Sequence, residues 1–66
     1  MKQATIDALE RAYLQLRRLC EDLYNAWQVA LENNDFDDAI FLQSQADKLF
    51  EEAINLEYII AEQEEQ

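Results

Sequence analysis

The sequence predicts an all-α fold: an antiparallel hairpin of two long helices, expected to dimerise into a four-helix bundle. Apolar or small residues recur in steps of three and four from Ile6 to Ala30 and again from Ala39 to Ile60. This spacing is typical of helices packed side by side. One short polar segment, Asn33-Asn34-Asp35, separates the two stretches. Glycine and proline are both absent, and sheets and ligand-binding loops use these residues for their tight turns.

The first helix is expected from about residue 4 to about residue 32. Asp7 and Glu10 lie near its start, where the helix dipole favours acidic side chains. Cys20 lies within the apolar stripe, so we expect it to be a small buried hydrophobe; a reactive or intermolecularly paired thiol is the alternative. The stripe consists of Ile6, Leu9, Tyr13, Leu16, Cys20, Leu23, Trp27 and Ala30, flanked by Ala12, Leu19 and Ala26 on one side and by Tyr24 and Leu31 on the other.

The turn is expected at residues 33–35. Asparagine tolerates the left-handed conformation that ends helices, so Asn33 or Asn34 is the expected C-cap. Asp35 is suited to the N-cap of the second helix, and Asp37 and Asp38 follow in its first turn, where negative charge is favourable.

The second helix is expected from about residue 36 to about residue 61, followed by a frayed acidic end at residues 62–66. Alanine alternates with leucine along its stripe, and small residues permit close approach to bulky partners such as Tyr13 and Trp27. The stripe consists of Ala39, Leu42, Ala46, Leu49, Ala53, Leu56 and Ile60. The whole chain, residues 1–66, is thus interpreted as a single helical-hairpin domain.

A second apolar stripe on the later helix predicts association. It comprises Phe36, Ile40, Phe50 and Ile54 and lies to the side of the first stripe, so one partner helix cannot cover both. An isolated hairpin of this length is marginal, because ordering the chain is costly and much apolar surface stays in water. We therefore expect a twofold homodimer, and a higher oligomer or an obligate hetero-complex is the alternative. Its expected interface residues are Leu9, Tyr13, Leu16, Leu23, Trp27, Leu42, Leu49, Phe50, Ile54 and Leu56.

Charge is distributed unevenly along the chain. Residues 1–33 contain four basic and five acidic residues, whereas residues 34–66 contain one basic and ten acidic residues, for a net charge of −10. Such a surface disfavours direct binding to nucleic acid, which depends on basic clusters. The acids could simply keep the protein soluble, dock on a basic partner protein, or mimic nucleic acid and block a DNA-binding protein. The candidate partner-binding residues are Phe36, Ile40, Asp37, Asp38, Asp47 and Glu51.

Nothing in the sequence predicts catalysis, and no catalytic, cofactor-binding or metal-ligating residues are proposed. Histidine is absent and there is one cysteine, which removes the usual ligands of zinc and di-iron sites. The acids at Asp35, Asp37 and Asp38 lack the glycine and the final glutamate of a calcium loop, so helix capping is the better interpretation. No segment predicts a membrane span, and Met1-Lys2-Gln3 does not start a signal peptide, so a cytoplasmic protein is expected.

The segment Asn34-Asp35-Phe36-Asp37-Asp38-Ala39-Ile40 resembles the inter-helix turn of tetratricopeptide repeats. The resemblance implies shared turn chemistry and not family membership, because Trp27 and Gln43 depart from the repeat pattern and both helices are about twice too long. In size and organisation the chain also resembles ROP-type dimeric hairpins and small orphan accessory proteins of phages. The function expected is that of a small accessory or regulatory factor acting through protein–protein contact. The alternative is a structural subunit that completes the fold of a hetero-complex.

Overall fold

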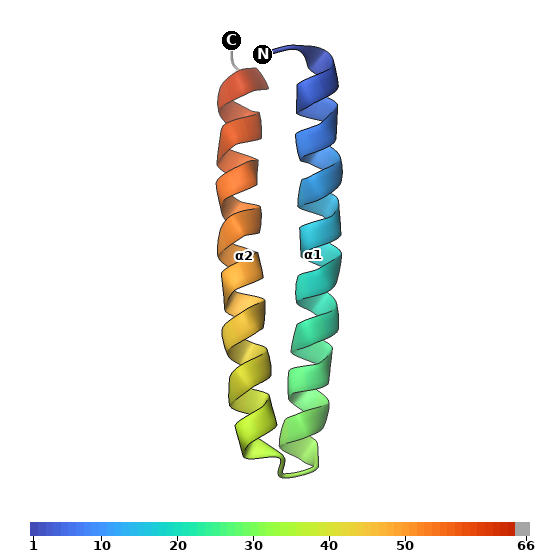
Figure 1. Cartoon of the computed structure of the whole chain (residues 1–66), viewed down its shortest axis with the longest axis vertical. Helices are drawn as coiled ribbons and strands as arrows, with labels where there is room; N and C mark the ends of the chain where they lie inside the picture. Colours follow the sequence, from blue (N-terminus) through green and yellow to red (C-terminus); the bar gives the residue numbers. More distant parts are fainter. Residues whose placement is uncertain (65–66) are drawn as a thin grey trace.

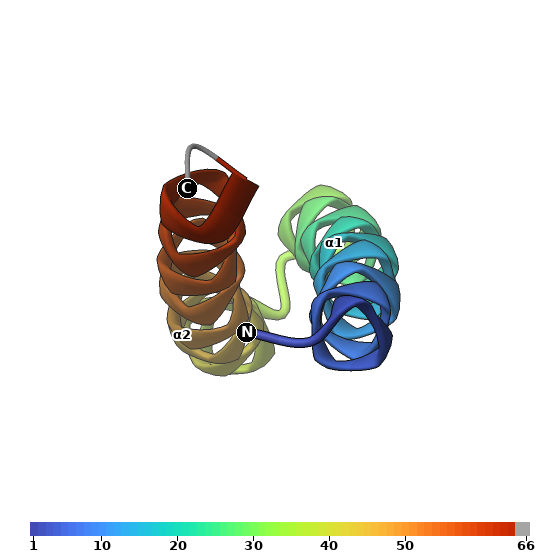
Figure 2. The same ribbon diagram turned by 90° about the horizontal axis from the view of Figure 1, so that it is seen from above.

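The computed structural model describes residues 1–64 and shows two antiparallel helices packed along their length (Figure 1). Helix α1 spans Gln3–Glu32 and helix α2 spans Phe36–Glu64. The hairpin measures 49 × 14 × 12 Å, and the start of α1 and the end of α2 lie at the end opposite the turn (Figure 1). Seen along the helices, α1 and α2 lie side by side, and residues 1–64 form no further layer (Figure 2). The predicted helical hairpin is confirmed.

The turn is built by its two asparagines. Asn33 is the C-cap of α1, as predicted, and Asn34 follows in the left-handed conformation with φ 63°. The Asn34 N–H donates to the Leu31 carbonyl at 3.1 Å, and the Asp35 N–H donates to the Ala30 carbonyl at 2.8 Å. These two bonds form a Schellman motif, which satisfies carbonyls that the end of a helix leaves unpaired. Asparagine therefore performs here the role that glycine performs at most such helix ends.

Helix α2 begins directly after this motif. Asp35 precedes the first helical residue, Phe36, and its carbonyl accepts the first helical bond from the Ala39 N–H at 2.9 Å, as an N-cap residue does. Asp37 and Asp38 occupy the first turn. At its other end the helix continues to Glu64, beyond the predicted end at about Ala61. Residues 65 and 66 of the predicted acidic end lie outside the described residues.

The core of the hairpin is narrow and made mostly of small side chains. Ala39, Ala46 and Ala53 are the most deeply buried residues, each at most 1% exposed. The other buried residues are Ile6, Cys20, Ala30 and Leu56. The small α2 alanines allow the two helices to approach closely, so the contact between them is tight but buries few large side chains. Neither helix carries a segment both long and apolar enough to cross a membrane.

Candidate interaction surfaces

The contact between Cys20 and Ala46 sets the register of the two helices. The Cys20 Sγ lies 3.7 Å from the Ala46 carbonyl oxygen, to which it donates, and both residues are buried. Toward the open end of the hairpin, Tyr13 lines a groove together with Glu57 and Ile60 of α2. Burial raises the pKa of the Cys20 thiol, which disfavours the reactive thiolate. The prediction of a small buried hydrophobe at this position is confirmed.

Most of the predicted dimer-interface residues lie along the contact between α1 and α2 and are incompletely covered there. Leu56 is buried, whereas Phe50 and Ile54 are 43% and 39% exposed. The half-buried members are Leu9, Tyr13, Leu16, Leu23, Trp27, Leu42 and Leu49. One partner helix thus shields only part of each of these side chains, and the hairpin retains apolar surface along both edges of the contact.

One long side of the hairpin, here called the tyrosine side, is marked by a bond between the helices. The Tyr24 hydroxyl donates to the Asp47 Oδ1 at 2.5 Å, and this bond is the first cause of a rise in the pKa of Tyr24 to about 12. The Tyr24 ring also meets Trp27 edge to face, with centroids 6.4 Å apart. Tyr24 and Trp27 are half-buried, so these aromatics brace the hairpin near its turn.

The same side carries charge toward the open end of the hairpin. Glu10 of α1 and Glu64 of α2 approach each other across the helices, and the pKa of Glu10 is raised by burial first and then by its hydrogen bond to, and repulsion from, Glu64. Arg17 donates to the Tyr13 hydroxyl at 3.0 Å and stacks on its ring at 5.9 Å. A shallow groove here is lined by Glu10, Tyr13, Glu57, Ile60, Ala61 and Glu64.

The predicted partner-binding residues all lie in water on α2. Phe36 and Ile40 are 58% and 67% exposed. With Phe50 and Ile54 they form what we call the α2 stripe, running down the helix on the tyrosine side. Asp37, Asp47 and Glu51 are exposed beside it, and exposed Asp38 lies toward the opposite flank of α2. Ile40, Asp47 and Glu51 border one shallow depression together with Gln43, Ser44 and Lys48, so apolar and acidic groups are indeed neighbours on this surface.

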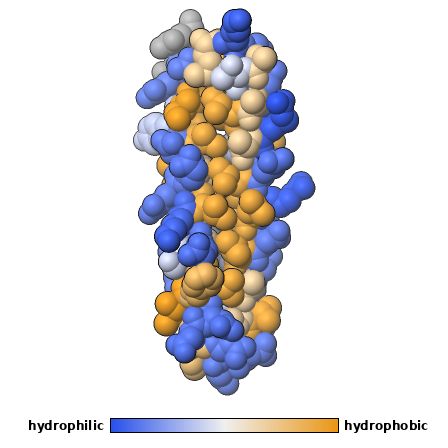
Figure 3. All heavy atoms as spheres, viewed as in Figure 1, coloured by the Kyte–Doolittle hydropathy of each residue, from blue (hydrophilic) through white to orange (hydrophobic). Residues whose placement is uncertain are grey.

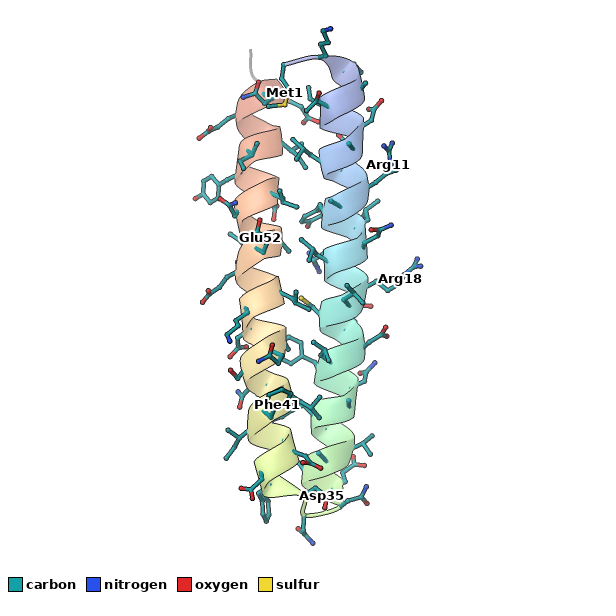
Figure 4. All side chains as sticks on the ribbon, in the orientation of Figure 1. Met1, Arg11, Arg18, Asp35, Phe41 and Glu52 are labelled. Carbon is teal, nitrogen blue, oxygen red and sulfur yellow. The ribbon has the colours of Figure 1, made fainter. Side chains whose placement is uncertain are left out.

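The opposite long side of the hairpin, here called the leucine side, is apolar along its α1 flank. On α1 the residues flanking the contact there are Ala12, Leu19 and Ala26, because these positions lie across the helix axis from Glu10, Arg17 and Tyr24. Leu19 is 50% exposed. On α2 this side carries Phe41, which is 64% exposed and projects toward the viewer together with Glu52 in Figure 4. A continuous hydrophobic strip follows the groove between the helices on this side (Figure 3).

Sequence reasoning named Leu19 only as a flanking residue and did not name Phe41 at all. Phe41 could have been predicted from its position around α2, counted at 100° per residue from the alanines of the contact. By contrast, Arg11 and Arg18 of α1 point away from α2 (Figure 4) and belong to neither side. Within residues 1–64, no group of three or more acidic or cysteine side chains is arranged to hold a metal ion.

Comparison of the chain with protein-family models, with curated proteins and with solved structures found no match.

Proposed function

We propose that the protein is a homodimer whose two hairpins form a four-helix bundle, and that it acts without catalysis as a small accessory factor through contact with another protein. The observation that supports this proposal is the distribution of apolar side chains. The buried residues are mostly alanine, whereas phenylalanine, leucine and isoleucine side chains lie substantially in water. Apolar surface of this extent on a small protein marks sites of protein contact.

Surface area supports the same proposal. The chain exposes 5086 Å², whereas a compact monomer of 7.8 kDa is expected to expose about 4,400 Å². The difference of roughly 700 Å² is close to the ~800 Å² that each partner buries in a standard protein interface. A second hairpin laid along one side would therefore bring each chain to the surface expected of a compact protein.

The α2 stripe supports the second part of the proposal. Its apolar residues stand beside Asp37, Asp47 and Glu51, and acidic groups around an apolar patch fit a partner surface that carries apolar side chains flanked by lysine or arginine. Charge complementarity of this kind speeds and orients the encounter of two proteins. The partner is thus a protein with a basic contact surface.

The experiment that tests self-association is the solution mass by light scattering over a range of concentrations, with helicity followed on the same samples. The expected result is a highly helical particle of twice the 7.8 kDa chain mass. A helical monomer at all concentrations would contradict the homodimer. A poorly helical chain that becomes helical only with another protein would favour the structural subunit of a hetero-complex.

The accessory role is tested by affinity capture from the source cells with three baits. The wild-type protein is compared with Ile40→Ser and with Glu51→Lys, because both residues are exposed on or beside the α2 stripe. The expected result is a captured protein that is lost with both variants and released by salt, while the mass and helicity of the baits stay unchanged. Capture that ignores both substitutions would contradict this docking surface.

A further inference from the structure

We infer that the second copy of the chain covers the leucine side of the hairpin, which carries Leu19 and Phe41, and leaves the tyrosine side with the α2 stripe free for another protein. This inference rests on the proposed homodimer and specifies its contact surface. The two sides are alternatives because each runs along the whole groove between α1 and α2, and a single added hairpin can cover one of them.

Charge on α1 distinguishes the two sides. On the tyrosine side the residues next to the contact include Glu10 and Arg17, whereas on the leucine side they are Ala12, Leu19 and Ala26. A helix that docks on the tyrosine side would have to desolvate charged groups of α1. On the leucine side α1 presents no charge at these positions, and the acids next to the contact are Asp38 and Glu52 of α2. Burying a charge without a partner is costly, so apolar association favours the leucine side.

Twofold symmetry doubles the charges on whichever side is buried. A homodimer presents the same surface patch from both chains, so every charge on the buried side is brought in twice. On the tyrosine side this would bring together two copies of Glu10, Glu57 and Glu64, and the pKa of Glu10 is already raised in one hairpin. Like charges that face each other across an interface suppress association. A second copy is therefore the wrong occupant for the tyrosine side, whereas a basic partner is a suitable one.

Shape supports the same assignment. Half-buried Ala12 and Ala26 stand on either side of exposed Leu19, which gives the α1 flank one protruding side chain between two small ones. Small residues let a neighbouring helix approach, and a protruding leucine fills the gap between side chains of that neighbour. Leu19 also lies near the middle of α1. A twofold axis close to this level would centre the interface on the hairpin.

The hydrophobic strip has the extent that a bundle needs. It runs along the groove rather than forming an isolated spot (Figure 3), and on α2 it is continued by exposed Phe41 and half-buried Ile59. Covering it would also shield the half-buried leucines of the hairpin contact from water. The chain exposes roughly 700 Å² more than a compact monomer of its mass, and this is the area that one such cover has to remove.

The test compares two matched substitutions, Leu19→Glu and Ile40→Glu. Each replaces an exposed aliphatic side chain, 50% or 67% in water, with one additional negative charge, so the change in net charge is the same. Circular dichroism and light scattering are measured on both variants and on the wild type. We expect Leu19→Glu to weaken the dimer at least about thirty-fold, the change that corresponds to about 2 kcal/mol at a central contact, and Ile40→Glu to leave it dimeric.

Any other result overturns either the assignment of the side or the homodimer itself. Dissociation by Ile40→Glu with a stable Leu19→Glu dimer overturns the assignment of the side and leaves the homodimer standing. Dissociation by both variants, or by neither, also overturns the assignment. A wild-type monomer overturns the proposed homodimer itself. If Leu19→Glu loses helicity, Phe41→Glu on the other helix replaces it in the comparison, and a fully dimeric Phe41→Glu variant contradicts the inference.

Discussion

The Tyr24 hydroxyl and the Asp47 carboxylate join the two helices by a hydrogen bond of 2.5 Å between Tyr24 Oη and Asp47 Oδ1. The two residues are far apart in the sequence, and the bond forms because the antiparallel register brings the middle of α2 to the level of the later part of α1. The bond fixes that register on one side of the hairpin, as the contact of Cys20 with Ala46 fixes it at the centre.

This bond predicts a late titration of Tyr24. Its pKa is raised to about 12 by the bond to Asp47, with burial and the negative charge of Asp47 adding to the effect, whereas an ordinary tyrosine has a pKa of about 10. Because the folded-state pKa is the higher one, the stabilising contribution is complete below pH about 10 and is lost as the pH rises through about 12. The ultraviolet titration curve of the wild type is compared with that of Tyr24→Phe. Their difference should show a tyrosine that ionises only near pH 12.

Asp47→Asn is the control for that titration. The amide retains an acceptor oxygen but removes the negative charge, so the Tyr24 pKa should fall back toward its ordinary value. A wild-type difference curve that titrates at the ordinary tyrosine pKa would contradict the bond between the helices.

Asn34 is predicted to tolerate glycine and to resist β-branched residues. Its φ of 63° lies in the left-handed region, where a side chain branched at Cβ is strained by about 1–2 kcal/mol. Asn34→Val should therefore lower the free energy of unfolding by about that amount, and Asn34→Gly should leave it nearly unchanged. Urea unfolding at one fixed protein concentration provides the measurement.

The neighbouring asparagine supplies a matched control. Asn33 has φ −93°, an ordinary value for any residue, so Asn33→Val should cost clearly less than Asn34→Val. Equal losses from the two valine variants would show that the left-handed residue does not determine the stability of the turn.

Several of these features could be predicted from the sequence because they depend on local spacing. The recurrence of apolar residues predicts which side of each helix is buried, and the pair of asparagines predicts where α1 ends. Spacing does not specify which residue of one helix lies beside which residue of the other, so the bond from Tyr24 to Asp47 was not predicted. The position of Phe41 around α2 does place it on the other flank, but it stands apart from the recurring apolar residues, so their spacing does not single it out.

The end of α2 shows another limit of local rules. Residues 62–66 are polar and acidic and are expected to fray, and the sequence therefore predicts an end near Ala61. The helix nevertheless continues to Glu64. Gln63 falls one heptad after Leu56 and is half-buried, and Glu64 lies near Glu10 of α1, so packing of the two helices favours helix beyond the predicted end.

Ala46 is predicted to be the position least tolerant of a larger side chain. It is 0% exposed and its carbonyl oxygen meets the Cys20 thiol, so a leucine there would force the helices apart. Overpacking of this kind typically costs about 1–3 kcal/mol. Ala46→Leu should lower the midpoint of urea unfolding, whereas Ala61→Leu, the same change at an exposed position of α2, should have little effect. Equal midpoints for Ala46→Leu and the wild type would contradict the close approach of the helices here.

Acid is predicted to stabilise the open end of the hairpin through Glu10. Burial, together with the approach of Glu64, raises the pKa of Glu10. A carboxyl group whose pKa is higher in the folded than in the unfolded state stabilises the fold when protonated, and this contribution is lost as the pH rises through the folded-state pKa. Glu10→Gln, which mimics the protonated group, should therefore melt at a higher temperature than the wild type at neutral pH. The difference should vanish on acidification.

The control is Glu21→Gln, an exposed position on the same helix, which removes the same charge away from Glu64. A gain from Glu21→Gln equal to that from Glu10→Gln would mean that reduced net charge, and not the meeting of Glu10 with Glu64, governs the effect of acid.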